Sequence, residues 1–117
     1  MILAVLDDLM FTSKIRSAAV GLGVPLTIAR SSEAALTEMK KNPPSLVIFD
    51  LNSPRTNPIA TITAMKNDAE LAGVPTLGFV SHVDSATISA ALAAGVGDVL
   101  ARSAFVADLP SILSAHK

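Results

Sequence analysis

Leu46-Val47-Ile48-Phe49-Asp50 decides the fold of this chain. It is a short apolar run that ends abruptly in an acidic side chain, a pattern typical of a buried strand in a parallel sheet. A second run of this kind, Ile2 to Leu6, ends at Asp7 and Asp8. In an open α/β sheet the ligand crevice lies at the carboxyl ends of the strands. The two runs therefore predict that three carboxylates meet at one edge of a sheet.

Five strand-like runs alternate with five segments that carry apolar residues at helical spacing. Strict alternation with short loops predicts a single α/β domain over residues 1–117, with a parallel sheet and helices on both faces. The expected strands are Ile2–Leu6, Pro25–Arg30, Ser45–Phe49, Pro75–Val80 and Asp98–Ala101. The expected helices begin near Leu9, Ser32, Asn57 and Ser85, and the last begins between Ser103 and Asp108.

Some local details of the helices are predicted from capping and spacing. The third helix is expected to end near Leu71. Pro110 is tolerated only in a first turn, so the last helix is expected either to start late or to bend. Met10 is expected in or near the core, and Leu22 on the inward face of the first helix. His82 is expected to be a solvated loop residue.

Composition excludes several classes of function. The net charge is −1, the nine basic residues are scattered, and Trp and Tyr are absent, so neither a nucleic-acid footprint nor a base-stacking platform is indicated. The absence of cysteine excludes disulfides and thiolate metal sites. No apolar run is long enough for a membrane span, and the start lacks the basic region of a signal peptide. We therefore expect a cytoplasmic protein that binds neither nucleic acid nor membrane.

Crowded carboxylates need a compensating charge. Like charges that lie close together raise one another's pKa and cost stability unless a cation is present. Oxygen ligands suit a hard divalent ion such as Mg²⁺, which would leave one carboxylate for chemistry. The alternative is that Asp7, Asp8 and Asp50 are incidental loop acids.

These residues resemble the receiver domain of bacterial response regulators, the flavodoxin-like module of two-component signalling. Asp7 and Asp8 match the metal-binding pair of that family, Asp50 matches its phosphoryl-accepting aspartate, and Asn52 stands where the family offers a backbone carbonyl to the metal. Pro54 and the segments 29–36 and 94–98 match as well. The resemblance implies a doubly wound sheet with strand order 2-1-3-4-5. It also implies Mg²⁺ held by Asp8, Asp50 and Asn52, with Asp7 acting mostly through water.

The chain departs from the family pattern where the phosphate would be read. The family's Thr or Ser is Val80, its Lys is Arg102, its proline after that Lys is Ser103, and its switch aromatic is Val99. Val80 cannot hydrogen-bond a phosphoryl oxygen, and the planar fork of arginine is not equivalent to a lysine ammonium. Ser81 is the alternative source of the missing hydroxyl, although strand alternation points it to the opposite face.

Two functions remain open at this point. In the first, the chain is a non-enzymatic receiver that accepts a phosphoryl group on Asp50 from a histidine kinase or a histidine phosphotransfer protein, with Mg²⁺. In the second, it is a pseudo-receiver, a protein-interaction module that does not depend on phosphate. The acids favour the first function, and the substitutions at the phosphate-reading positions favour the second.

A partner surface is predicted on the fourth helix. Its residues after Asp84 carry no charge, and Ile88 and Leu92 are expected to face inward because they are four residues apart. Small side chains would then face outward and allow close approach of another chain. We expect Ala90, Ala93 and the nearby Phe105 to contact a partner or a second copy. The alternative is a helix rich in alanine for its propensity alone.

Overall fold

The computed structural model describes residues 1–81 and 84–117, so His82 lies outside the described residues. It contains one five-stranded sheet in the order β2-β1-β3-β4-β5, and all four neighbouring pairs are parallel. The predicted fold class and strand order are confirmed. The strands are β1 (Ile2–Val5), β2 (Leu26–Ala29), β3 (Leu46–Asp50), β4 (Thr76–Val80) and β5 (Val99–Ala101).

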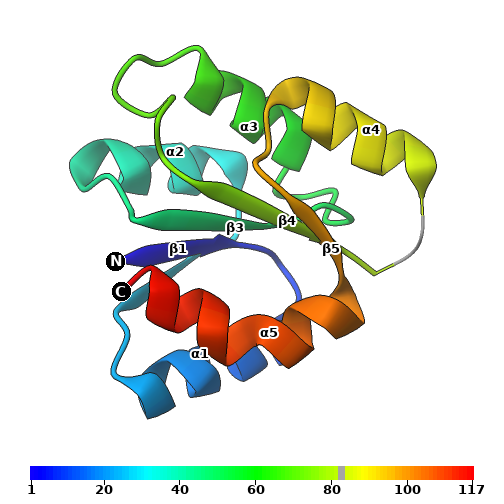
Figure 1. Cartoon of the computed structure of the whole chain (residues 1–117). Helices are drawn as coiled ribbons and strands as arrows, with labels where there is room; N and C mark the ends of the chain where they lie inside the picture. Colours follow the sequence, from blue (N-terminus) through cyan, green and yellow to red (C-terminus); the bar gives the residue numbers. More distant parts are fainter. Residues whose placement is uncertain (82–83) are drawn as a thin grey trace.

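Helices cover both faces of the sheet (Figure 1). One face carries α2, α3 and α4, and the other carries α1 and α5. No helix in the described ranges is long and apolar enough to cross a membrane. The helices are α1 (Leu9–Leu22), α2 (Ser32–Lys41), α3 (Pro58–Lys66), α4 (Ser85–Ala94) and α5 (Arg102–Ala115).

Each face of the sheet has its own hydrophobic core. Alternate residues of β3 point to opposite faces, so Phe49 packs with α2, α3 and α4, whereas Ile48 packs with α1 and α5. On the second face the rings of Phe79 and Phe105 stack with their centroids 4.7 Å apart, and the ring of Phe11 lies 5.0 Å from that of Phe79. This aromatic cluster fixes the first turn of α1 against the first turn of α5, directly beneath the carboxyl edge of the sheet.

Side-chain caps start three of the helices, those at Ser31 and Asp84 as predicted and that at Asp8 in addition. Asp8, Ser31 and Asp84 accept hydrogen bonds from backbone N–H groups in the first turns of α1, α2 and α4. Gly23 and Gly95 end α1 and α4 with positive φ angles of 67° and 112°. These local signals set the boundaries of the helices.

The predicted end of α3 is wrong. The helix ends at Lys66, and residues 68–73 form turns before β4. Asp68 accepts a hydrogen bond from the Glu70 N–H at 2.9 Å and pairs with Lys40 at 2.6 Å. Aspartate side chains that bond nearby backbone in this way compete with the helix and favour a turn.

The last helix begins earlier than predicted, at Arg102, and contains Pro110 in its interior. Three buried residues at helical spacing, Phe105, Leu109 and Leu113, explain why the helix continues through the proline. Each such side chain contributes about 1.5–3 kcal/mol on burial, which together exceeds the roughly 3 kcal/mol that an interior proline costs. Pro110 itself is exposed.

Some predicted side-chain orientations are also wrong. Met10 is 86% exposed and Leu22 is 39% exposed, so neither belongs to the core. On α4, Ile88 packs against the core as predicted, but Ala91 is buried and Leu92 is 51% exposed, because the helix is rotated from the predicted face. Phe105 is fully buried in the α1/α5 core and does not lie on the predicted partner surface.

Candidate functional site

The predicted acids do meet at the carboxyl edge of the sheet. Asp7 and Asp8 follow β1, and Asp50 ends β3, the neighbouring parallel strand. Together with Asn52 and Arg55 they line a cavity of about 320 Å³, named here the acidic crevice. The remaining lining residues are Ser53 and Pro54.

Both carboxylate oxygens of Asp8 are engaged. Oδ1 accepts the Phe11 N–H at 3.0 Å as the cap of α1, and Oδ2 lies 3.3 Å from the Arg102 Nη2. The pKa of Asp8 is held below its ordinary value, mainly by the backbone hydrogen bond from Phe11. Partial burial acts in the opposite direction and raises the pKa, whereas Arg102 lowers it further. Asp8 is therefore an ionised cap with an internal counter-ion.

Asp50 is more enclosed. Burial raises its pKa above the ordinary value, opposed by a 3.0 Å hydrogen bond from the Asn52 N–H and by the charge of Arg102. The nearby charge of Asp8 acts in the same direction as burial. Ionisation of the Asp50 carboxyl group therefore costs free energy, and the Asn52 N–H and Arg102 offset only part of that cost.

Arg102 is the cation of this edge, although it begins α5 rather than ending β5 as predicted. Its guanidinium carbon lies 3.9 Å from the centre of the Phe11 ring, a cation–π contact. Its Nη1 donates to the Ser81 Oγ at 3.4 Å, a long contact, while Nη2 faces Asp8. One side chain therefore links the loops that follow β1, β4 and β5.

The phosphate-reading positions of the family are occupied as follows. Val80 is 4% exposed and packs in the core under α2, α3 and α4, so it brings no hydroxyl to the crevice. Ser81 is exposed, and its Oγ faces Arg102. Strand alternation ends with β4 at Val80, which explains why Ser81 reaches this edge. Val99, at the switch position, is half-buried against the same core as Val80.

Asn52 closes the crevice with its side chain. Its Oδ1 accepts the Ser81 N–H at 2.6 Å and thereby joins the loop after β3 to the end of β4. The resemblance assigns its backbone carbonyl to a metal instead, and no contact of the described residues tests that role. Asn52 thus has a structural role at this edge.

Two further residues belong to the site. Arg55 Nε lies 3.5 Å from the Asp7 Oδ2, so Arg55 meets an anionic group near the site, which the sequence left open beside a solvated loop role. Phe11 serves as the platform for Arg102, although the sequence indicated only a core position. The acidic pair after β1 was the available signal for Arg55, since adjacent carboxylates attract a nearby cation.

Two acids of the crevice, Asp7 and Asp8, are paired with arginines of the chain. Within residues 1–81 and 84–117, no three His, Cys, Asp or Glu side chains lie close enough together to hold a metal ion. Asp8 and Asp7 each face an arginine, and Asp8 has no oxygen left without a partner. The compensating positive charge that crowded carboxylates require is supplied by the chain itself.

No protein-family model matches the chain, and no curated protein matches it in sequence. Solved structures do match its fold. A protein described as a response regulator from Chloroflexus aurantiacus is 25% identical, with a TM-score of 0.82 over 97% of this chain and 96% of that one. A response regulator from Hahella chejuensis is 20% identical, with a TM-score of 0.85 over 97% and 91%.

A third similar structure is the Mn²⁺-bound form of the response regulator Rcp1, which is 20% identical with a TM-score of 0.77. The match covers 97% of this chain and 88% of that one. These proteins share the order of elements and nearly the whole length with the present chain. The chain therefore has the receiver-domain fold of response regulators.

Proposed function

We propose that this chain is a receiver-like signalling module that acts through protein contacts and neither accepts a phosphoryl group nor catalyses a reaction. The observation that carries the proposal is the pairing of Asp8 with Arg102 at 3.3 Å, while its other oxygen caps α1. A metal ion could bind Asp8 only by displacing an internal cation and weakening a helix cap.

The surroundings of Asp50 support the same function. Phosphoryl transfer depends on positioned cations and hydrogen-bond donors around the phosphoryl oxygens. Val80 is a buried apolar residue where a donor is needed. Arg102 is already shared between Asp8, Ser81 and the ring of Phe11. The donors that would stabilise a phosphoryl group are thus either absent or committed.

A phosphoryl-accepting receiver is the second candidate function. It is supported by the shared crevice of Asp7, Asp8, Asp50 and Asn52, which keeps the arrangement that the family resemblance implies. In that case Mg²⁺ would be the cofactor, and the partner would be a histidine kinase or a histidine phosphotransfer protein. Both candidates use the same fold, so they differ only in whether Asp50 reacts.

Intact-mass measurement after incubation with Mg²⁺ and acetyl phosphate distinguishes the two. We expect the wild-type chain to remain unmodified and a Val80→Thr/Arg102→Lys variant to gain one phosphoryl group. Asp50→Asn, made in both backgrounds, is the matched control for modification elsewhere. A phosphoryl adduct on the wild-type chain that disappears in Asp50→Asn would reject the proposal in favour of the second candidate.

A further inference from the structure

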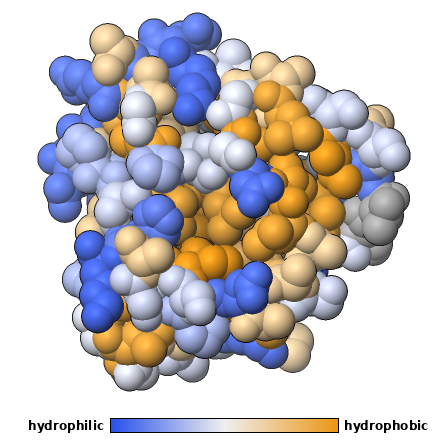
Figure 2. Space-filling view, in the orientation of Figure 1, coloured by the Kyte–Doolittle hydropathy of each residue, from blue (hydrophilic) through white to orange (hydrophobic). Residues whose placement is uncertain are grey.

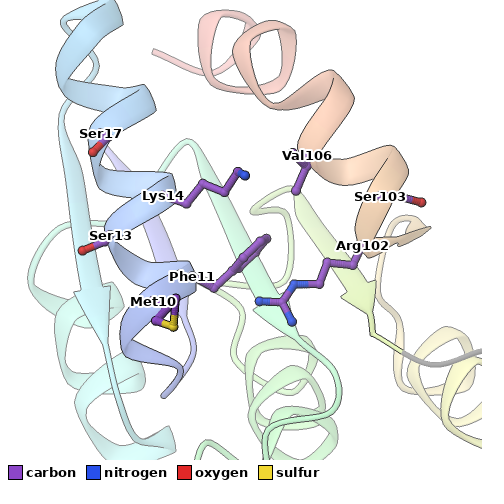
Figure 3. Close-up of a pocket in the computed structure, with 8 residues that line it drawn as sticks. All are labelled: Met10, Phe11, Ser13, Lys14, Ser17, Arg102, Ser103 and Val106. Carbon is purple, nitrogen blue, oxygen red and sulfur yellow. The ribbon is translucent and has the colours of Figure 1, made fainter.

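A groove of about 920 Å³ runs between α1 and α5, beside the acidic crevice (Figure 3). We call it the α1–α5 groove. Met10, Phe11 and Lys14 line it from α1, and Arg102 and Val106 line it from α5. Serine hydroxyls from both helices complete its lining. None of these residues was singled out as a binding site by the sequence except Arg102.

The inner surface of the groove is apolar. The ring of Phe11 stands between the two helices, and Val106 faces it from α5 (Figure 3). Met10 leaves most of its side chain in solvent at the mouth of the groove. Phe11 itself is 5% exposed and lies under the guanidinium of Arg102, so the apolar surface open to a ligand is that of Met10 and Val106. Removing that surface from water favours a ligand that can cover it.

The charges of the groove are all positive. Lys14 extends from α1 toward Val106, and the guanidinium of Arg102 approaches from the other side (Figure 3). No acidic residue lines the groove, and α1 contains no acid along its whole length. Within the described part of the chain, Lys14 takes part in no ion pair with another side chain. An anion is the complementary occupant.

We propose that the α1–α5 groove binds a small anion with an apolar body, of the class of aryl or alkyl carboxylates. The carboxylate would pair with Lys14, and the apolar body would cover Met10 and Val106 beside the guanidinium of Arg102. The volume falls within the range of roughly 300–1,000 Å³ that is usual for small-molecule sites.

Such a ligand would communicate with the acidic crevice. Arg102 borders both sites, since Nη2 pairs with Asp8 while the guanidinium lies over Phe11 in the groove. An anion in the groove would add a second negative charge beside Arg102, which already pairs with Asp8. The module would thus respond to a small anion in place of a phosphoryl group. Binding in the groove itself does not depend on whether Asp50 is phosphorylated.

NMR titration of the full chain with naphthoate tests the proposal, with the neutral analogue naphthamide as the ligand control. We expect saturable backbone shifts at Phe11, Lys14 and Val106, and additional shifts at Asp8 and Ser81. Lys14→Gln is expected to weaken binding about twofold to fivefold, the size of one exposed ion pair. Raising the salt concentration should weaken naphthoate binding further.

Lys41→Gln is the matched control variant, because Lys41 is equally exposed but lies on α2, on the other face of the sheet. It is expected to leave naphthoate binding unchanged. The proposal is overturned if naphthoate produces no saturable shift in the groove, if naphthamide binds as tightly, or if Lys14→Gln and Lys41→Gln have the same affinity as the wild-type chain.

Discussion

The guanidinium of Arg102 lies 3.3 Å from the carboxylate of Asp8, although 94 residues separate the two in the sequence. Phe11 completes the arrangement, since it donates its N–H to Asp8 and carries Arg102 over its ring. A fixed positive charge thus lies at the edge where the resemblance implies a metal. In place of a bound metal ion, this edge therefore carries the positive charge of the Arg102 side chain.

Removing the guanidinium of Arg102 should make the stability of the protein depend on divalent metal ions. With Arg102→Ala, the negative charges of Asp8 and Asp50 lose the positive charge that compensates them most. Binding of a divalent ion in the acidic crevice therefore becomes more favourable. We expect Mg²⁺ or Mn²⁺, at concentrations of the order of millimolar, to raise the melting temperature of this variant by a few degrees through mass action. The wild-type chain should respond less. Thermal unfolding with and without metal measures the difference.

Arg16→Ala is the matched control for this experiment, because Arg16 is an exposed arginine on α1 that is no part of the crevice. It should behave like the wild-type chain. If the wild-type chain and Arg102→Ala gain the same stability from metal, the guanidinium does not take the place of a metal ion.

Asp50→Asn should stabilise the protein at neutral pH. Burial raises the pKa of Asp50 in the folded chain, so its ionised form is destabilising there. The amide keeps an oxygen that can accept the Asn52 N–H and removes the charge. We expect the melting temperature to rise by a few degrees, the size of a gain of about 1 kcal/mol in a domain of this length. Differential scanning calorimetry measures it.

The gain in stability from Asp50→Asn should depend on pH. Because the folded-state pKa of Asp50 lies above the ordinary value of 3.8, protonation of its carboxyl favours the folded state. That contribution is complete below the ordinary pKa and is lost as the pH rises through the folded-state pKa. The advantage of Asp50→Asn should therefore shrink on acidification. An advantage that grows toward low pH would contradict the burial cost.

Two substitutions at Asp8 should separate its cap from its ion pair. Asp8→Ala removes the side chain that accepts the Phe11 N–H, and loss of such a cap costs about 1 kcal/mol. Asp8→Asn keeps a capping oxygen and loses only the charge that faces Arg102, an exposed pair worth about 0–1 kcal/mol. Urea unfolding should thus rank the stabilities as wild type, then Asp8→Asn, then Asp8→Ala. Equal stability of the two variants would mean that the cap contributes nothing.

The sheet and the meeting of the acids could be predicted from the sequence because both depend on local pattern. The apolar runs that end in Asp8 and Asp50 specify parallel strands, and parallel strands bring their carboxyl ends together. The ion pair between Asp8 and Arg102 could not be predicted in the same way. It depends on how closely the loops after β1 and β5 approach, which the packing of Phe11, Phe79 and Phe105 determines.

Helix faces were predicted less well where the apolar pattern is weak. In α4 almost every side chain is small or apolar, so spacing alone did not distinguish Ala91 from Leu92 as the inward position. In α5 the proline signal was given too much weight against the buried stripe of Phe105, Leu109 and Leu113. In both helices the tertiary core, rather than local propensity, decides the outcome.

The rotation of α4 strengthens the case for a contact surface there. Ala90 and Ala93 are exposed as predicted, and Leu92 is a large apolar side chain that is exposed on the same helix. No charged residue occurs from Ser85 to Ala94. Figure 2 shows apolar side chains gathered over the part of the surface where α4 lies in Figure 1. A contiguous apolar area of this kind marks an interaction site more often than a free surface.

We predict that α4 mediates self-association of the chain, and that Ala90→Glu or Ala93→Glu abolishes it. A buried unpaired carboxylate at such a contact is costly, whereas glutamate preserves the helix because its helix propensity is high. Sedimentation velocity over a range of protein concentrations measures the association, and circular dichroism checks the fold. Ala34→Glu, at an exposed position of α2, is the matched control and should associate like the wild-type chain. A wild-type chain that sediments as a monomer at every concentration, or an Ala90→Glu variant that associates unchanged, would show that α4 carries no contact between copies.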